Sequence, residues 1–237
     1  RKKTQTCISI RRVFKMNKKT SDIPLFINII ITGLPSLARQ GMSSLATATM
    51  NILARPYGDA TIAAMSIVMR LGFILFAVGL GIGQGFQPVS GFNYGAGRYD
   101  RVKKATYFTW IFSTIVLIVM GVVMWFICGD LIAVFRNDPA VIEIGIPAMR
   151  YQLVVLPALP VCFIGNMLFQ SIGKSGRALF LSCLRSGICY IPVILIVTGT
   201  FGIIGIQIAQ PASDVLSAII TLPFMLSFLK KIDPSHN

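Results

Sequence analysis

Amides, hydroxyls and guanidinium groups recur at helical spacing inside the apolar stretches of this 237-residue chain. Between residues 25 and 54, such side chains fall within an arc of roughly 140° when residues are placed 100° apart around a helix axis. Hydrogen bonding between helices needs amides and hydroxyls, but an ionised arginine inside a membrane is costly and usually functional. The stripe therefore favours a water-filled binding cavity over purely structural contacts. Its members are Ser36, Arg39, Gln40, Ser43, Ser44, Thr47 and Asn51.

Further polar stripes occur on other apolar stretches. Residues 60–91 place Ser66, Arg70, Gln84 and Gln87 on one side, and residues 141–171 place three amides on one face. Binding by several polar-lined helices near the middle of the membrane is typical of transporters. The alternative is helix–helix hydrogen bonding, which stabilises by about 1 kcal/mol or less per bond. The cavity wall predicted from these stripes consists of Arg39, Gln40, Ser43, Asn51, Arg70, Gln84, Gln87, Gln152, Asn166 and Gln170.

A charge pair is predicted between the last two apolar stretches. Asp214 is the only acid deep within any of them, and Arg185 lies on the stretch before it, beyond the short turn Thr198–Gly202. At 1.5 Å per residue their depths differ by about 8 Å, which an arginine side chain and some helix tilt can span. Pairing relieves part of the penalty of an isolated charge in the membrane. A structural ion pair is the favoured interpretation, and the alternatives are a proton-carrying Asp214 and no contact between the two residues.

No enzyme, cofactor or metal site is expected. The only histidine is His236, the five cysteines form no CxxC motif, and the chain has no paired-carboxylate site and no GxSxG motif. Nucleic-acid binding is disfavoured despite a net charge of +14, because the basic residues lie between apolar runs and form no basic face on a polar domain.

The elements that carry the stripes read as membrane spans. Hydrophobic residues make up 54% of the chain and charged residues 13%, against about 25% charged in soluble domains. A span needs about 20 apolar residues. Six windows meet this length, and the sequence predicts an all-α protein with six spans. The windows are 25–54, 60–91, 105–127, 141–171, 177–199 and 203–229.

The lysines and arginines predict the orientation of the chain. If residues 1–24 are cytoplasmic, the cytoplasmic segments hold sixteen basic residues and the opposite loops hold two, Arg55 and Arg136. Both termini are therefore expected in the cytoplasm. The predicted division is a basic arm (1–24), a membrane lobe (25–229) and a tail (230–237). The chain begins with Arg1 and not with methionine, so we expect a fragment of a longer protein.

The glycine-rich stretch GQGFQPVSGFNYGAG, residues 83–97, is not expected to bind phosphate. It lacks GxGxxG spacing and GK[ST], and it follows no predicted strand. It reads as the end of the second span and its exit loop. The pairs Gly81/Gly85 and Gly91/Gly95 have the small-xxx-small spacing that lets helices approach closely in a membrane.

Three blocks of this sequence resemble the C-terminal half of multidrug and toxic compound extrusion (MATE) transporters, with the bacterial multidrug exporters as the most similar branch. They are residues 33–65, residues 70–105 and residues 166–194, and within them GQGFQPVSGFNYGA and FQSIGKSGRA are the most specific. The resemblance implies one six-helix lobe of a twelve-helix transporter that exports small organic, often cationic, compounds. Proton or sodium is the implied coupling ion, and the N-terminal six-helix lobe is the implied missing partner.

The resemblance also marks departures from the family. The acidic site of the first lobe has no counterpart in this chain, and the first and fourth spans carry no carboxylate within the membrane. Two alternatives stay open. One is a flippase of lipid-linked oligosaccharides from the same superfamily, for which a broad arginine-rich cavity would argue because phosphates bind cations. The other is a six-span half-protein that dimerises as a channel or scaffold.

Overall fold

The computed structural model of the protein describes residues 23–232, and every regular element in that range is helical. The longest helices are α2 (Ile23–Ala54), α3 (Asp59–Gly95), α4 (Tyr99–Phe135) and α9 (Ile203–Lys231), with the short helix η1 (Arg55–Tyr57) between α2 and α3. Two further passages are broken into shorter helices. The first comprises α5 (Pro139–Val155), η2 (Leu156–Ala158) and α6 (Leu159–Ser171), and the second α7 (Ser175–Cys183), η3 (Leu184–Ile188) and α8 (Tyr190–Phe201).

The division into arm, membrane lobe and tail stays a prediction, and the structure gives the ends of the helices that the lobe would contain. Residues 23 and 24 already belong to α2, and α9 extends to Lys231, two residues beyond the predicted end of the lobe. The basic arm up to residue 22 and the tail from residue 233 lie outside the described residues, and so do Cys7 and His236. Helix α4 is longer than its predicted window at both ends. The N-terminal extension carries several charged residues and the C-terminal one contains Asp130, which lowers the mean hydropathy there.

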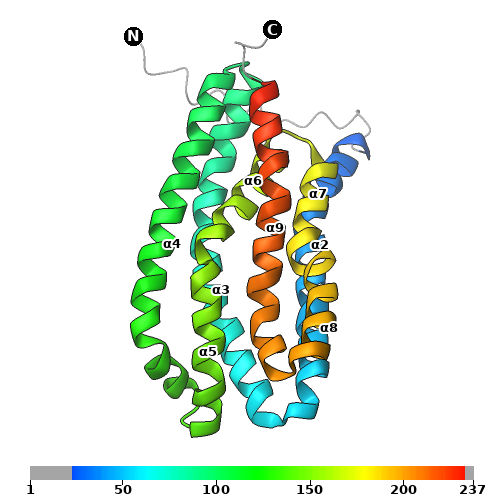
Figure 1. The fold of residues 1–237 in the computed structure, drawn as a ribbon. Helices are drawn as coiled ribbons and strands as arrows, with labels where there is room; N and C mark the ends of the chain where they lie inside the picture. The colour runs from blue at the N-terminus through cyan, green and yellow to red at the C-terminus, as the bar shows by residue number, and fades with distance from the viewer. Residues whose placement is uncertain (1–22, 233–237) are drawn as a thin grey trace, which may run out of the picture.

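The helices form an up-and-down bundle (Figure 1). The start of α2, the α3–α4 turn, the α6–α7 turn and the end of α9 lie at one end of the bundle, and the α4–α5 and α8–α9 turns lie at the other. Positive-φ glycines occupy several of these turns: Gly58 before α3, Gly97 before α4, Gly173 before α7 and Gly202 before α9. The left-handed backbone that these turns need is favourable mainly for glycine.

Four passages of the described chain are long and apolar enough to cross a membrane. They are α3, α4, the continuous passage α5–η2–α6 and α9, while α8 is apolar but shorter. For these four passages, the predicted length and apolarity of a membrane span are confirmed. For α2 and for α7–η3–α8 the predicted span stays a prediction.

The bundle is not packed evenly. Helix α3 packs on α4, α5 and α6, whereas α2 packs on α7, η3 and α8 and touches α3 only slightly. Helix α4 exposes an apolar side, as expected for a lipid-facing helix. Of its most apolar stretch of 18 residues, 22% is buried inside the bundle, against 78% for the corresponding stretch of α5–η2–α6. Consecutive helices α2 and α3 therefore belong to different sides of the bundle.

The glycine contacts differ from the prediction. Glycines 81, 85 and 95 have open space where a side chain would begin, so the proposed close approach at these positions is wrong for the described chain. Helix α6 instead lies over Gly79, Gly83 and Gly91, where an added Cβ would meet Phe163, Met167 and the backbone oxygen of Ser171. The observed glycines are also four residues or a multiple of four apart, but the first two lie on the opposite face of α3 from the predicted pair.

Candidate functional site

A cavity of about 150 Å³ lies between α2, α3 and the later helices. Its rim includes Gln40 and Phe73, which are exposed, and its inner wall includes Tyr190, which is buried. The wall combines amides, guanidinium groups, aromatic rings and aliphatic side chains, which suits an organic ligand with polar substituents. The lining residues are Arg39, Gln40, Ser43, Ala46, Met65, Val68, Met69, Gly72, Phe73, Phe76, Ala148, Gln152, Arg185, Tyr190, Gln207 and Gln210.

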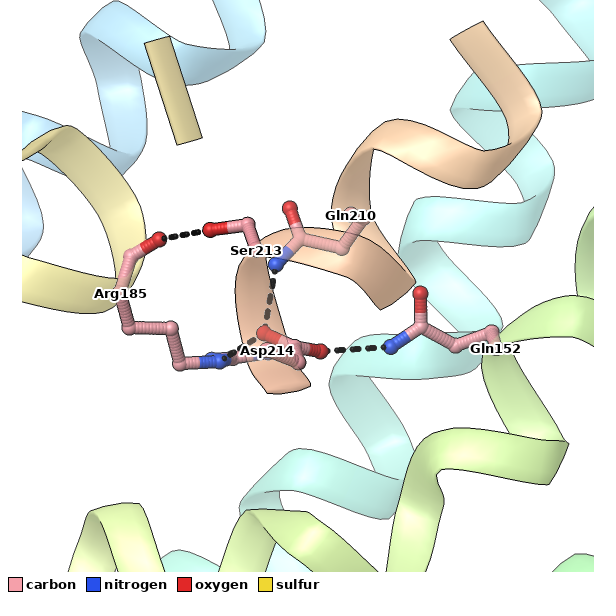
Figure 2. Close-up of polar contacts among 5 residues, drawn as sticks. All are labelled: Gln152, Arg185, Gln210, Ser213 and Asp214. Carbon is pink, nitrogen blue, oxygen red and sulfur yellow. Dashed lines mark hydrogen bonds and ion pairs between the residues drawn. The ribbon is translucent and has the colours of Figure 1, made fainter. Parts of the chain in front are cut away.

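Asp214 is the centre of a hydrogen-bonded cluster (Figure 2). Three of its partners line this cavity: Gln152, Arg185 and Gln210. The Asp214 carboxylate is completely buried. Its Oδ1 accepts hydrogen bonds from Arg185 Nε at 2.6 Å and Gln210 Nε2 at 3.0 Å, and its Oδ2 accepts one from Gln152 Nε2 at 3.0 Å. Arg185 Nη2 lies 3.4 Å from Oδ2. A buried carboxylate needs such a set of donors, because each lone pair left without a partner is destabilising.

The predicted contact between Arg185 and Asp214 is therefore present. Its role, whether structural or proton-carrying, stays a prediction. The two partners differ in burial. The Arg185 side chain is 18% exposed and borders the cavity, whereas the Asp214 side chain is 0% exposed and does not line it. The guanidinium carbon of Arg185 also lies 4.7 Å from the centroid of the Phe76 ring, within the range of a cation–π contact.

The backbone around Arg185 is a π-helical segment, η3. Cys189 N–H donates to the Leu184 carbonyl at 2.8 Å, five residues earlier. Ser213 Oγ of α9 donates to the Arg185 carbonyl at 2.9 Å, so α9 holds both the backbone and the side chain of Arg185 (Figure 2). Single π turns inside α-helices occur often at functional sites. This one directs a guanidinium group toward both the cavity and Asp214.

A second, smaller cavity of about 30 Å³ shares three lining residues with the first: Arg39, Phe76 and Arg185. Asn166, one of the predicted cavity residues, borders this smaller cavity. Its side-chain amide donates to the Ala178 carbonyl at 2.8 Å and to Ser182 Oγ at 2.6 Å, so it also ties α6 to α7.

The structure divides the other nine predicted cavity residues into three groups. Arg39, Gln40, Ser43 and Gln152 line the larger cavity. Gln87 and Gln170 hydrogen-bond to each other at 2.8 Å, away from both cavities, and Gln170 Nε2 lies 3.4 Å from Ser36 Oγ. The remaining three predicted residues are exposed and border neither cavity, so the structure does not bring them to the site: Asn51, Arg70 and Gln84.

Several lining residues were absent from the predicted set. Gln207 and Gln210 belong to a polar stripe that also contains Asp214, so the sequence held a signal for them. Gln207 donates to the Ile144 carbonyl at 3.0 Å and Gln210 to Asp214. The aromatic residues Phe73, Phe76 and Tyr190 gave no such signal, since aromatic side chains are common in apolar helices. Within residues 23–232, no three His, Cys, Asp or Glu side chains come together as metal ligands.

The MatE family model matches residues 35–196, which is most of the chain. This chain belongs to the MATE family. Within the family, it is 22% identical over 197 residues to the multidrug export protein MepA of Staphylococcus saprophyticus, covering 82% of this chain and 43% of MepA. It is 26% identical over 187 residues to MepA of Staphylococcus aureus, covering 78% of this chain and 38% of that protein.

Solved MATE structures share the fold. A crystal structure of a mutant of the Vibrio cholerae MATE transporter VcmN superimposes with a TM-score of 0.84 at 18% identity, covering 95% of this chain and 52% of that one. An outward-facing multidrug resistance MATE transporter gives a TM-score of 0.83 at 19% identity, covering 91% and 49%. The chain thus spans about half the length, or less, of the MATE proteins that it matches. The chain is therefore a multi-pass membrane protein of this family.

Proposed function

We propose that this chain forms the C-terminal six-helix lobe of a multidrug export antiporter driven by an inward flow of protons or sodium ions. One observation carries the proposal: in a chain of the MATE family, helices α2, α3, α5, α8 and α9 jointly wall a cavity with amides, guanidinium groups and aromatic rings. The resemblance of residues 70–105 and 166–194 to the second half of the family supports the choice of lobe.

In this proposal, the cavity is one half of a substrate site. A volume of about 150 Å³ is small for a drug-sized ligand, whose pockets usually measure about 300–1,000 Å³. The exposed rim residues Gln40 and Phe73 would contact a substrate held against another lobe. Alternating access then requires that the two lobes move against each other around the bound substrate. The Asp214 cluster keeps Arg185 fixed during such a motion.

Expression in drug-sensitive cells tests the proposal. The chain alone should give no protection against a panel of toxic dyes and antibiotics, because alternating access needs two lobes. Fusion behind the first lobe of a MATE relative should restore protection and dye efflux. In the fusion, Gln40→Leu should reduce efflux, whereas Gln84→Leu, an exposed change outside both cavities, serves as the matched control.

Three outcomes would contradict the proposal: protection by the chain alone, failure of every correctly folded fusion, or equal effects of the two glutamine substitutions. Each fusion carries a fluorescent-protein tag, and its folding is checked by size-exclusion chromatography with fluorescence detection.

We also infer that both ends of the lobe face the cytoplasm, on the basis of the sixteen-to-two distribution of basic residues. In a variant without native cysteines, Arg101→Cys should resist an impermeant thiol reagent in intact cells, and Arg136→Cys should react with it. Both should react once the membrane is permeabilised. Labelling of position 101 but not of position 136 in intact cells would reverse the orientation.

A further inference from the structure

We propose that the larger cavity binds an aromatic carboxylate, with the ligand's carboxylate on the Arg39 guanidinium group. The inference rests on the proposed export function, since it names the class of substrate that the same cavity would hold. It differs from the cationic substrates that the family resemblance implies.

The wall of the cavity carries a positive charge that no acid among residues 23–232 neutralises. Its lining includes two arginines and no aspartate or glutamate. Arg185 is neutralised by Asp214, which is fully buried and does not line the cavity. No ion pair within residues 23–232 joins Arg39 to an acid. A ligand in the cavity therefore meets one positive charge that its walls do not compensate, and an anion is favoured there over a cation.

Arg39 is the arginine that lies in position to bind a ligand. Arg39, Phe76 and Arg185 border both cavities, so the two arginines lie where the cavities adjoin. Arg185 directs its Nε and Nη2 toward Asp214, which leaves Arg39 as the arginine available to a ligand. A guanidinium group binds a carboxylate through two parallel hydrogen bonds, a geometry that lysine does not offer.

The other walls match the rest of such a ligand. Phe73 and Phe76 offer aromatic faces and Met69 a flexible apolar surface. The Gln40 amide on the rim provides a further hydrogen-bond donor for the carboxylate. A volume of about 150 Å³ has room for one substituted aromatic ring, so a benzoate is a suitable minimal probe.

The test uses the purified 237-residue chain in neutral maltoside micelles, with two probes of opposite charge: 4-fluorobenzoate and 4-fluorobenzylammonium. Binding of each is followed by ¹⁹F NMR, with protein-free micelles as the background. Benzoate should bind at least about tenfold more tightly than benzylammonium, because hydrogen bonds to a charged group are the stronger ones. Arg39→Gln should weaken benzoate binding about tenfold or more and should not weaken benzylammonium binding.

Two further variants test whether the position and the geometry of the Arg39 charge matter. Arg70→Gln removes the same charge from an exposed position outside both cavities and should leave benzoate binding unchanged. Arg39→Lys keeps the charge but loses the two-pronged geometry, so its affinity should fall between those of the wild type and Arg39→Gln.

Benzylammonium binding as tight as benzoate binding would overturn the proposal, and so would equal losses in Arg39→Gln and Arg70→Gln. If Arg39→Gln does not fold, as judged by circular dichroism and gel filtration, the comparison of the two probes on the wild type decides alone. Failure of the proposed export function is distinguishable. Selective benzoate binding without efflux by the two-lobe fusion contradicts export only, whereas efflux with preferred benzylammonium binding contradicts the anion site only.

Discussion

Two interior contacts of this bundle hold helices together in different ways. Where α3 meets α6, Phe163 and Met167 fill the space over Gly79 and Gly83, and the contact is mostly apolar. Where η3 meets α9, an arginine reaches a buried aspartate, and a serine binds the backbone carbonyl of that arginine. The first contact depends on shape and the second on hydrogen bonds and charge. The cavity lies beside the second, because buried polar groups can be satisfied there and still face a ligand.

The largest expected effect concerns the polar contact. Arg185→Gln or Asp214→Asn alone should destabilise the chain by about 3–5 kcal/mol, because each leaves the partner charge buried and unpaired. The double variant should be more stable than the sum of the single effects predicts. Thermal unfolding followed by fluorescence-detected size exclusion measures all four proteins. Strict additivity of the two single effects would show that the contact is not energetically coupled.

The apolar contact should respond to added volume. Gly79→Ala places a methyl group against the rigid ring of Phe163, and we expect a loss of about 1–3 kcal/mol from overpacking, since the ring adapts less easily than a flexible side chain. Gly81→Ala is the matched control two residues further along α3, where no atom lies within 4 Å of the new Cβ. It should be neutral or stabilising by up to about 1 kcal/mol, since alanine favours the helix over glycine. Equal thermal stability of the two variants would mean that α6 does not lie on this face of α3.

A smaller effect is expected for the hydrogen bond that supports the π-helical segment. Ser213→Ala removes the donor to the Arg185 carbonyl and should destabilise by about 1 kcal/mol. Benzoate affinity should stay unchanged, because the ligand's carboxylate lies on Arg39 and not on Arg185. Ser44→Ala is the control, because its hydroxyl binds only the Gln40 carbonyl of its own helix. Thermal unfolding and ¹⁹F NMR together separate the two readouts, and equal thermal stability of both variants would contradict a supporting role.

The smallest effect should occur at the amide pair between α3 and α6. Gln87→Leu breaks the bond to Gln170 and should destabilise by about 0.6 kcal/mol, the average found for single polar contacts within membranes. Gln84→Leu, three residues earlier and exposed, should change stability less. A loss above about 2 kcal/mol for Gln87→Leu would place this pair with the Asp214 cluster and would blur the distinction between the two contacts.

Sequence reasoning found the helices more readily than their mutual orientation. Hydropathy located the apolar part of each passage, and the depth argument brought Arg185 and Asp214 together because a short turn joins their helices. The glycines of α3 show where such reasoning ends. Positions 79, 81, 83 and 85 are all glycine, and a shift of two residues turns the helix by about 200°. Only the neighbouring helix decides which pair is buried.

The same limit explains the mixed outcome for the cavity. A stripe defines a face of one helix, so Arg39, Gln40 and Ser43 were found together on α2. It does not say which helix lies opposite, and Arg70 and Gln84 of α3 therefore lie outside the cavity. The π turn could not be predicted from the sequence either. Its stabilising partner, Ser213, lies 28 residues from Arg185, and no local residue pattern specifies it.

The unequal packing of α2 has a consequence for the order of folding. Helix α2 is synthesised first among the described elements, yet it packs mainly on α7, η3 and α8, which follow more than a hundred residues later. At about 5–20 residues per second, α2 waits on the order of ten seconds for these neighbours. During that interval the helices that cover the hydroxyls, amides and guanidinium group of α2 in the folded bundle have not yet been synthesised. The bundle therefore closes late, when the last third of the chain returns to the first helix.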